Sequence, residues 1–355
     1  MKLKFGFYSD SGLLNVIFFT KFIYVFLAEF VYSKFTQLGD TARYLNSGFH
    51  LGTDSTSIMD FLGFFAGKLP PPFYHLPMML LSFYGVSYLV NTLSKFDLIG
   101  TFNRRCCLFF LVSLPSTGIW SSIHSKEAVG FFFVSIITSF LIKANFQNGR
   151  LPNFVEFLSI ALCFIFKPQY MICFISLYSY ISICQMLRSS AGIKFFILLI
   201  FVLVQILILY HFAALIDKLS FLIYSHFDVE GAMSTRENIF YEKWDFFKYA
   251  PYGMFIAFWG PTFQEALTSF AKSITFIESF ALSSMLIYMI LATFKRVLNG
   301  KFNVYFLGML FFTLFWILLV HYPFGVFNPG SGIRYRTNFI PLLVGILFLT
   351  SNRSH

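Results

Sequence analysis

Apolar runs of about 20 residues recur along nearly the whole chain, separated by short polar segments. A helix needs about that length to cross the hydrocarbon core of a bilayer, and all its backbone hydrogen bonds close within the helix. The runs therefore predict an all-α, polytopic transmembrane bundle of about ten spans. The predicted spans cover residues 12–32, 75–92, 106–119, 128–142, 153–166, 168–187, 195–215, 273–294, 302–320 and 337–350.

The composition supports a membrane environment for most of the chain. Of the 355 residues 57% are hydrophobic and only 12% are charged, with a mean hydropathy of +0.72. A soluble protein of this length could not bury so much apolar surface. We find no internal repeat and no linker, so residues 1–355 are expected to form a single integral membrane domain. Residues 251–271 are apolar but interrupted at Gly260-Pro261, which fits a re-entrant element, an interfacial element or half of an eleventh span.

The basic residues predict the orientation. With both termini inside, the inner segments hold 13 Lys and Arg, and the outer segments hold 12 in more than twice the length. Two outer loops are long, residues 33–74 and 216–250, and these are expected to be periplasmic. The net charge of +10 is scattered over the loops and not gathered into a stripe, so no nucleic-acid partner is expected.

The first outer loop carries a compact polar motif. If residues 40–45 form a short helix, Asp40, Arg43 and Tyr44 share one face. A carboxylate there could act as a general base toward a sugar hydroxyl, and the arginine could orient it or bind an anion. The alternative is that Asp40 caps a solvated helix and pairs with Arg43.

Two lysines and a glutamate occur at other predicted span ends. Lys126 and Glu127 stand at the mouth of the span 128–142, where an ionisable pair is costly to keep. The alternative is a capping Glu127 with a snorkelling Lys126. Lys167 precedes Pro168, and the simplest role of these residues is a tight outer turn between two helices; a cation in that turn could also contact a phosphate.

The remaining candidates are arginines in later outer segments. Arg334, Tyr335 and Arg336 follow an Asn-Pro-Gly-Ser-Gly turn, and arginine suits phosphate or diphosphate oxygens. The alternative is snorkelling at the interface. Arg236 lies among acidic and aromatic residues of the loop 216–250, a mixture that suits a carbohydrate or an amphipathic helix lying on the membrane.

Several catalytic signatures are missing from the sequence. We find no Walker A sequence, no Gly-x-Gly-x-x-Gly, no His-Glu-x-x-His and no Gly-x-Ser-x-Gly. The five cysteines all lie in apolar runs, so neither a disulfide framework nor a metal site is predicted. ATP hydrolysis, zinc proteolysis and the usual serine hydrolase chemistry are therefore poorly supported.

Together, Asp40 after the first span, the segment from Trp120 to Glu127, and Arg334-Tyr335-Arg336 before the last span resemble bacterial GT-C glycosyltransferases. Within that superfamily, the chain looks most like the O-antigen or capsule repeat-unit polymerases of the Wzy type. The resemblance implies a multi-pass protein of the bacterial inner membrane that joins oligosaccharides carried on undecaprenyl diphosphate at the periplasmic face. A chain-length regulator would be a further partner, and no cofactor is implied.

The resemblance also implies residue roles. Asp40 would be the first-loop base, Glu127 the second catalytic acid, and Arg334 and Arg336 would stabilise the departing lipid diphosphate. Many GT-C enzymes carry paired acids in the first loop, whereas Thr41 follows Asp40 here, so no metal is expected. Two alternatives stay open: a transferase that adds a single sugar from a polyprenyl-phosphate donor, and a lipid-linked oligosaccharide flippase.

Overall fold

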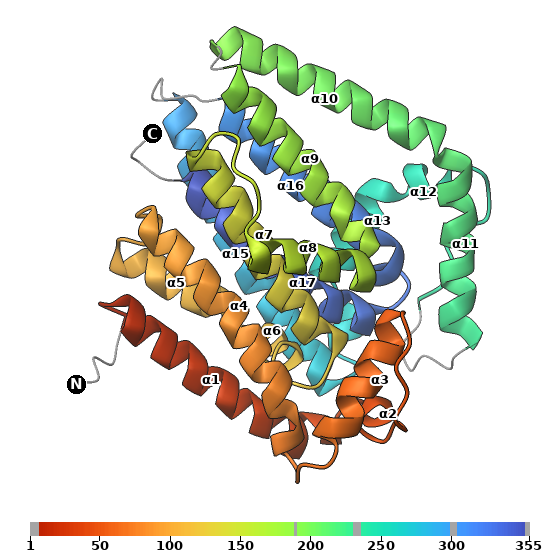
Figure 1. Cartoon of the computed structure of the whole chain (residues 1–355). Helices are drawn as coiled ribbons and strands as arrows, with labels where there is room; N and C mark the ends of the chain where they lie inside the picture. The colour runs from red at the N-terminus through yellow and green to blue at the C-terminus, as the bar shows by residue number, and fades with distance from the viewer. Residues whose placement is uncertain (1–6, 188–189, 230–235, 299–303, 352–355) are drawn as a thin grey trace. The chain divides into compact units, whose positions relative to one another are not determined.

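The computed structural model describes residues 7–187, 190–229, 236–298 and 304–351, and within these ranges every regular element is a helix. Figure 1 shows their arrangement. The helices are α1 (Asp10–Phe30), η1 (Tyr32–Lys34), α2 (Thr41–Leu45), α3 (Ser55–Ala66), η2 (Phe73–His75), α4 (Leu76–Lys95), α5 (Phe102–Val112), α6 (Pro115–Trp120), α7 (Lys126–Phe146), α8 (Phe154–Phe166), α9 (Pro168–Met186), α10 (Ala191–His211), α11 (Ala213–Val229), α12 (Asp245–Lys248), α13 (Ala250–Trp259), α14 (Phe263–Ala266), α15 (Phe270–Leu298), α16 (Val304–Gly325) and α17 (Pro329–Thr350).

Seven helical segments in the described residues are long and apolar enough to cross a membrane. They are Asp10–Lys34, Phe73–Lys95, Lys126–Phe146, Ala191–His211, Phe270–Tyr288, Val304–Gly325 and Pro329–Thr350. Each overlaps a predicted span, which confirms the prediction of a helical, polytopic membrane protein. The number of ten spans stays a prediction.

The other three predicted spans also hold helices, but these differ from simple spans. Residues 106–119 are divided between α5 and α6, because Pro115 has no amide hydrogen to continue the first helix. Helix α8 has 13 residues and is about 20 Å long, shorter than the hydrocarbon core. Helix α9 has 19 residues and is not among the seven candidate spans.

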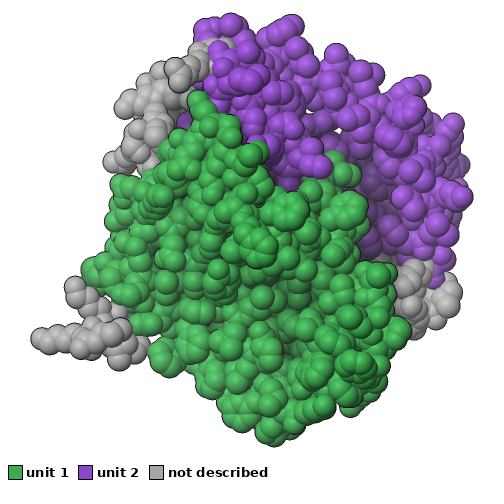
Figure 2. Space-filling model, in the orientation of Figure 1, with its two compact units in different colours: residues 1–172, 337–355 green, residues 173–336 purple. Residues whose placement is uncertain are grey.

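The chain forms two compact units, drawn in green and purple in Figure 2. Unit 1 comprises residues 1–172 and 337–355, and unit 2 comprises residues 173–336. The boundaries fall inside α9 and α17, so neither coincides with a linker. A single domain over residues 1–355 stays a prediction.

Unit 1 is built around α7, which is buried along nearly its whole length. Helices α1, α4 and α7 lie side by side in Figure 1, and α8 also packs on α7. Helices α4 and α7 approach closely at Gly85 of α4, where an added Cβ would lie 2.8 Å from Cα of Phe132. Lys21 of α1 is buried and donates to the hydroxyls of Ser121 and Ser82, at 2.5 and 3.1 Å. Unit 1 therefore keeps some buried polar contacts between otherwise apolar helices.

In unit 2, α13 packs on α16, and Gly253 of α13 leaves room for the ring of Tyr322. Helix α10 is almost entirely exposed although it is the most apolar of the candidate spans. Such a surface is expected where the surrounding solvent is lipid.

Both predicted long loops contain helices. Residues 33–74 hold α2 and α3 between short 3₁₀ turns. Residues 216–229, predicted as loop, belong to α11, because the apolar pattern continues past Phe212 into a second helix; residues 230–235 lie outside the described part. The interrupted stretch 251–271 is divided at Gly260-Pro261, between α13 and α14.

Candidate functional site

Asp40 lies at the N-terminus of the predicted short helix, α2. Its carboxylate does not cap the helix: it accepts a hydrogen bond from the Tyr44 hydroxyl at 3.2 Å. Arg43 lies 4.0 Å from the same carboxylate. The three residues thus share one face of the helix, as their spacing predicts. The Asp40 side chain is 48% exposed, so the carboxylate remains accessible to a substrate hydroxyl.

Tyr44 and Arg43, the two neighbours of this carboxylate, differ in how far they are buried. Tyr44 is buried, and burial together with the charges of Asp40 and Glu127 raises the pKa of its hydroxyl, which therefore stays protonated and donates. Arg43 is half exposed, lies over the Tyr44 ring at 4.9 Å, and is 3.9 Å from Asp60 of α3. Arg43 is therefore loosely held and can reorient toward an anion.

Helix α3 packs against α2. Gly63 and Gly67 let the carbonyls of Tyr44 and Leu45 approach so closely that a Cβ would lie 2.1 and 2.2 Å from them. The start of α3 is fixed by Asp54, which accepts from the Ser57 hydroxyl and from the amides of residues 56 and 57. These hydrogen bonds lower the pKa of Asp54 to about 2.

The start of α7 brings a second set of charges to unit 1. Ser125 caps this helix by accepting from the Ala128 amide, so Lys126 and Glu127 fall in its first turn. The Lys126 ammonium donates to the Thr56 hydroxyl of α3 at 2.6 Å, and Glu127 is 1% exposed. Four charged side chains also act electrostatically on Lys126: Lys167, Asp40, Glu127 and Arg43.

Lys167 ends α8 directly before α9 and is buried. The predicted tight turn is therefore present, and the lysine in it lies within electrostatic range of Lys126. Unit 1 thus brings together six of the ten predicted site residues: Asp40, Arg43, Tyr44, Lys126, Glu127 and Lys167. An accessible carboxylate can accept a proton, and the cations around it can bind an anionic group.

The other four predicted residues belong to unit 2. Arg336 is buried: it donates to the Ser279 hydroxyl at 2.7 Å and to the Phe258 carbonyl at 3.2 Å, and it lies 3.6 Å from Glu278. Arg334 is partly buried, and Tyr335 packs edge-on against Phe324. Arg336 therefore serves the packing of unit 2 in this conformation.

Arg236 is likewise engaged by the protein itself. Its guanidinium forms a bidentate pair with Glu265 at 2.7 and 2.8 Å, and it donates to the carbonyls of Gly325 and Val326. Burial disfavours the charged form of Glu265, but Arg236 and the Thr262 amide outweigh it and lower the pKa of Glu265 to about 2. The geometry gives Arg236 a structural role.

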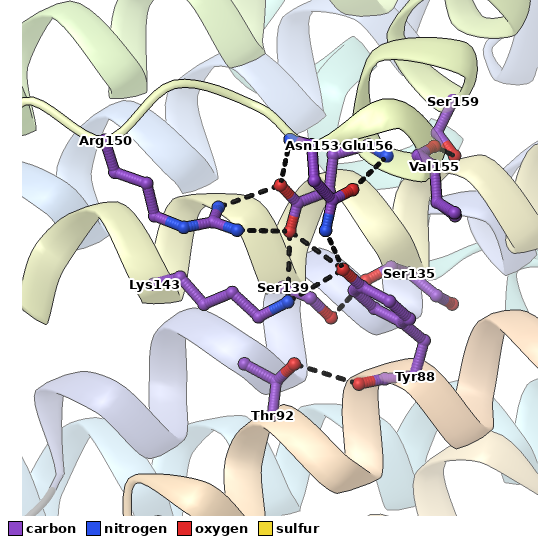
Figure 3. A network of polar contacts seen from close by, with 10 residues as sticks. All are labelled: Tyr88, Thr92, Ser135, Ser139, Lys143, Arg150, Asn153, Val155, Glu156 and Ser159. Atoms are coloured by element: carbon purple, nitrogen blue, oxygen red, sulfur yellow. Dashed lines mark hydrogen bonds and ion pairs between the residues drawn. The ribbon is translucent and has the colours of Figure 1, made fainter. Parts of the chain in front are cut away.

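A further network lies at the opposite end of α7, about 25 Å from Lys126 along the helix axis. Figure 3 shows Glu156 accepting from Lys143, Arg150, the Asn153 amide and the Tyr88 hydroxyl, at 2.8 to 3.2 Å. Every oxygen of this buried carboxylate is satisfied, so Glu156 links α4, α7 and α8 and has little capacity left for a ligand.

The partners that hold these groups were not predicted from the sequence. Thr56 and Asp60 lie on one face of α3 and contact Lys126 and Arg43. Glu265 could have been found, because it is the last residue of a Thr-x-x-Glu capping box that starts at Thr262. Within the described ranges, no group of three or more His, Cys, Asp or Glu is placed to hold a metal ion.

The helices and their hydropathy define the class of the protein as an all-helical membrane protein with several spans. In comparisons with known proteins, no family model, no curated sequence and no solved structure matches the chain.

Proposed function

We propose that the protein is a glycosyltransferase that polymerises lipid-linked oligosaccharide units at the outer face of a bacterial inner membrane. The observation that carries the proposal is the accessible carboxylate of Asp40 beside Arg43 and within electrostatic range of Lys126. A lipid-borne donor presents a sugar and a phosphate at the membrane surface, so a base and cations are needed close together. Asp40 supplies the base, and Arg43 and Lys126 supply cations; Lys126 stands at the start of the apolar helix α7.

In the proposed reaction, Asp40 accepts the proton of the acceptor hydroxyl while that oxygen forms a bond to the anomeric carbon of the donor sugar. The bond between this carbon and the diphosphate oxygen breaks, and the diphosphate leaves with the electron pair. Lys126, Lys167 and Arg43 stabilise the charge that develops on the leaving group. The Tyr44 hydroxyl orients the Asp40 carboxylate through its hydrogen bond.

The remaining predicted residues have different places in the proposal. Glu127 is buried beside Lys126 and acts on it electrostatically. Arg334 and Tyr335 belong to unit 2 and are given no role in the reaction. Arg336 and Arg236 support the fold through their ion pairs with Glu278 and Glu265.

The product of the reaction distinguishes a polymerase from a single-sugar transferase and from a flippase. The purified protein in lipid nanodiscs, supplied with undecaprenyl-diphosphate-linked repeat units, should produce a ladder of chains that differ by one unit. A single added sugar from a polyprenyl-phosphate donor would instead identify a monosaccharide transferase. Movement of substrate between leaflets without any new glycosidic bond would identify a flippase.

A further inference from the structure

A chain of buried contacts in unit 1 leads from α1 to α2 by way of two histidines. Nε2 of His75 lies 3.4 Å from the Glu29 carboxylate, and Nδ1 of the same ring accepts from the His124 amide at 3.2 Å. The His124 carbonyl then accepts from the Thr41 hydroxyl at 3.0 Å. Thr41 is the first residue of α2 and directly follows Asp40.

The hydrogen bond from His124 determines the form of the His75 ring. An imidazole nitrogen that accepts a hydrogen bond carries no proton, so the single proton of neutral His75 resides on Nε2. Nε2 faces Glu29, whose negative charge favours a proton there. His75 is completely buried, so water cannot replace it as the acceptor for the His124 amide.

His124 contacts both residues that hold Asp40 in place. Besides the Thr41 hydrogen bond, its ring packs 6.2 Å from the ring of Tyr44, which donates to Asp40. Two residues further along the chain, Lys126 begins α7. The segment that His75 fixes therefore contacts both neighbours of Asp40 and carries Lys126, one of the cations of the proposed site.

We propose that His75, whose ring accepts a hydrogen bond from the His124 amide, is a positioning residue that holds segment 121–127 so that Asp40 and Lys126 keep their relative placement. This inference rests on the proposed function, since the placement matters only if the two residues act on one substrate. His75 itself lies behind His124 and contacts no substrate.

Two substitutions of His75 separate its roles. Asparagine can present its amide oxygen near the position of Nδ1, whereas the longer glutamine places its amide near Nε2. His75→Asn should therefore preserve the acceptor for the His124 amide, and His75→Gln should remove it. His50→Gln provides the matched control, because His50 is exposed between α2 and α3.

The first measurement is amide hydrogen exchange of the full-length protein in nanodiscs, over peptides that contain residues 41–45 and 121–127. His75→Gln should raise exchange of the His124 segment about tenfold, the effect of losing one buried hydrogen bond. His75→Asn and His50→Gln should retain the exchange of the unsubstituted protein.

The second measurement is the rate of chain extension under saturating substrate. His75→Gln should lower this rate about tenfold, and His75→Asn should restore it. The inference is overturned if His75→Gln leaves exchange or rate unchanged, or if His75→Asn fails to restore both. Normal extension by Asp40→Asn would reject the proposed function instead, and the exchange data would still show whether His75 fixes the segment.

Discussion

Acidic side chains in this protein differ in how many hydrogen bonds and ion pairs their carboxylates accept from the protein. Glu156 and Glu265 are each bound by arginine and by backbone amides, so their capacity to accept further hydrogen bonds is largely used. Asp40 receives one side-chain hydrogen bond, from Tyr44, and is about half exposed. At the residue scale, this contrast is the reason to place the reaction at Asp40.

The Arg236–Glu265 pair should contribute to stability in a pH-dependent way. The pKa of Glu265 is lowered from 4.5 to about 2 in the folded protein, so the pair contributes fully above pH 4.5 and loses its contribution as the pH falls toward 2. We expect Glu265→Gln to lower the free energy of unfolding at pH 7 by roughly 1.5 to 3 kcal/mol.

Thermal unfolding of detergent-solubilised protein at pH 7 and pH 3.5 measures this effect. The difference between the two pH values should be smaller in Glu265→Gln than in the unsubstituted protein. The control is Glu242→Gln, which removes an exposed carboxylate of unit 2. Equal pH dependence in all three proteins would show that the pair does not stabilise the fold.

At the scale of elements, helical spacing and hydropathy made most long helices predictable. They also placed Asp40, Arg43 and Tyr44 on one face before the fold was known. The break at Pro115 was not anticipated, since hydropathy averages over the residues on both sides of it. The partners of buried charged residues were harder to predict. Arg336, for example, is buried beside Glu278, which lies 58 positions earlier in the chain.

Contact between α4 and α7 depends on the absence of a side chain at Gly85. An added Cβ would lie 2.8 Å from Cα and 2.9 Å from the carbonyl oxygen of Phe132, so Gly85→Ala should push the helices apart. Overpacking of this kind costs roughly 1 to 3 kcal/mol. Thermal unfolding in detergent should show the corresponding loss.

The matched control for this contact is Gly192→Ala in the first turn of α10. No atom lies within 4 Å of the added Cβ there, and alanine is the better helix former, so stability should be unchanged or slightly higher. Similar melting temperatures for the two variants would argue against close packing of α4 on α7.

At the scale of the whole molecule, the proposed reaction requires α2 and the start of α7 to face the periplasm. A cysteine in place of Gly48, which is exposed with open space around it, should react with a membrane-impermeant maleimide in intact spheroplasts. A cysteine in place of Asn148, between α7 and α8, should react only after lysis. The reverse pattern would place Asp40 in the cytosol.

Chain extension by Asp40→Asn tests the central claim most directly. The substitution keeps the size of the side chain but removes the base, so ladders should disappear while protein level and membrane insertion stay normal, with a rate loss of about 100-fold or more. The control is Asp97→Asn, an exposed position with φ of 52° that asparagine tolerates; its ladders should be normal. Full-length ladders from Asp40→Asn at the unsubstituted rate would contradict the assignment of Asp40 as the base.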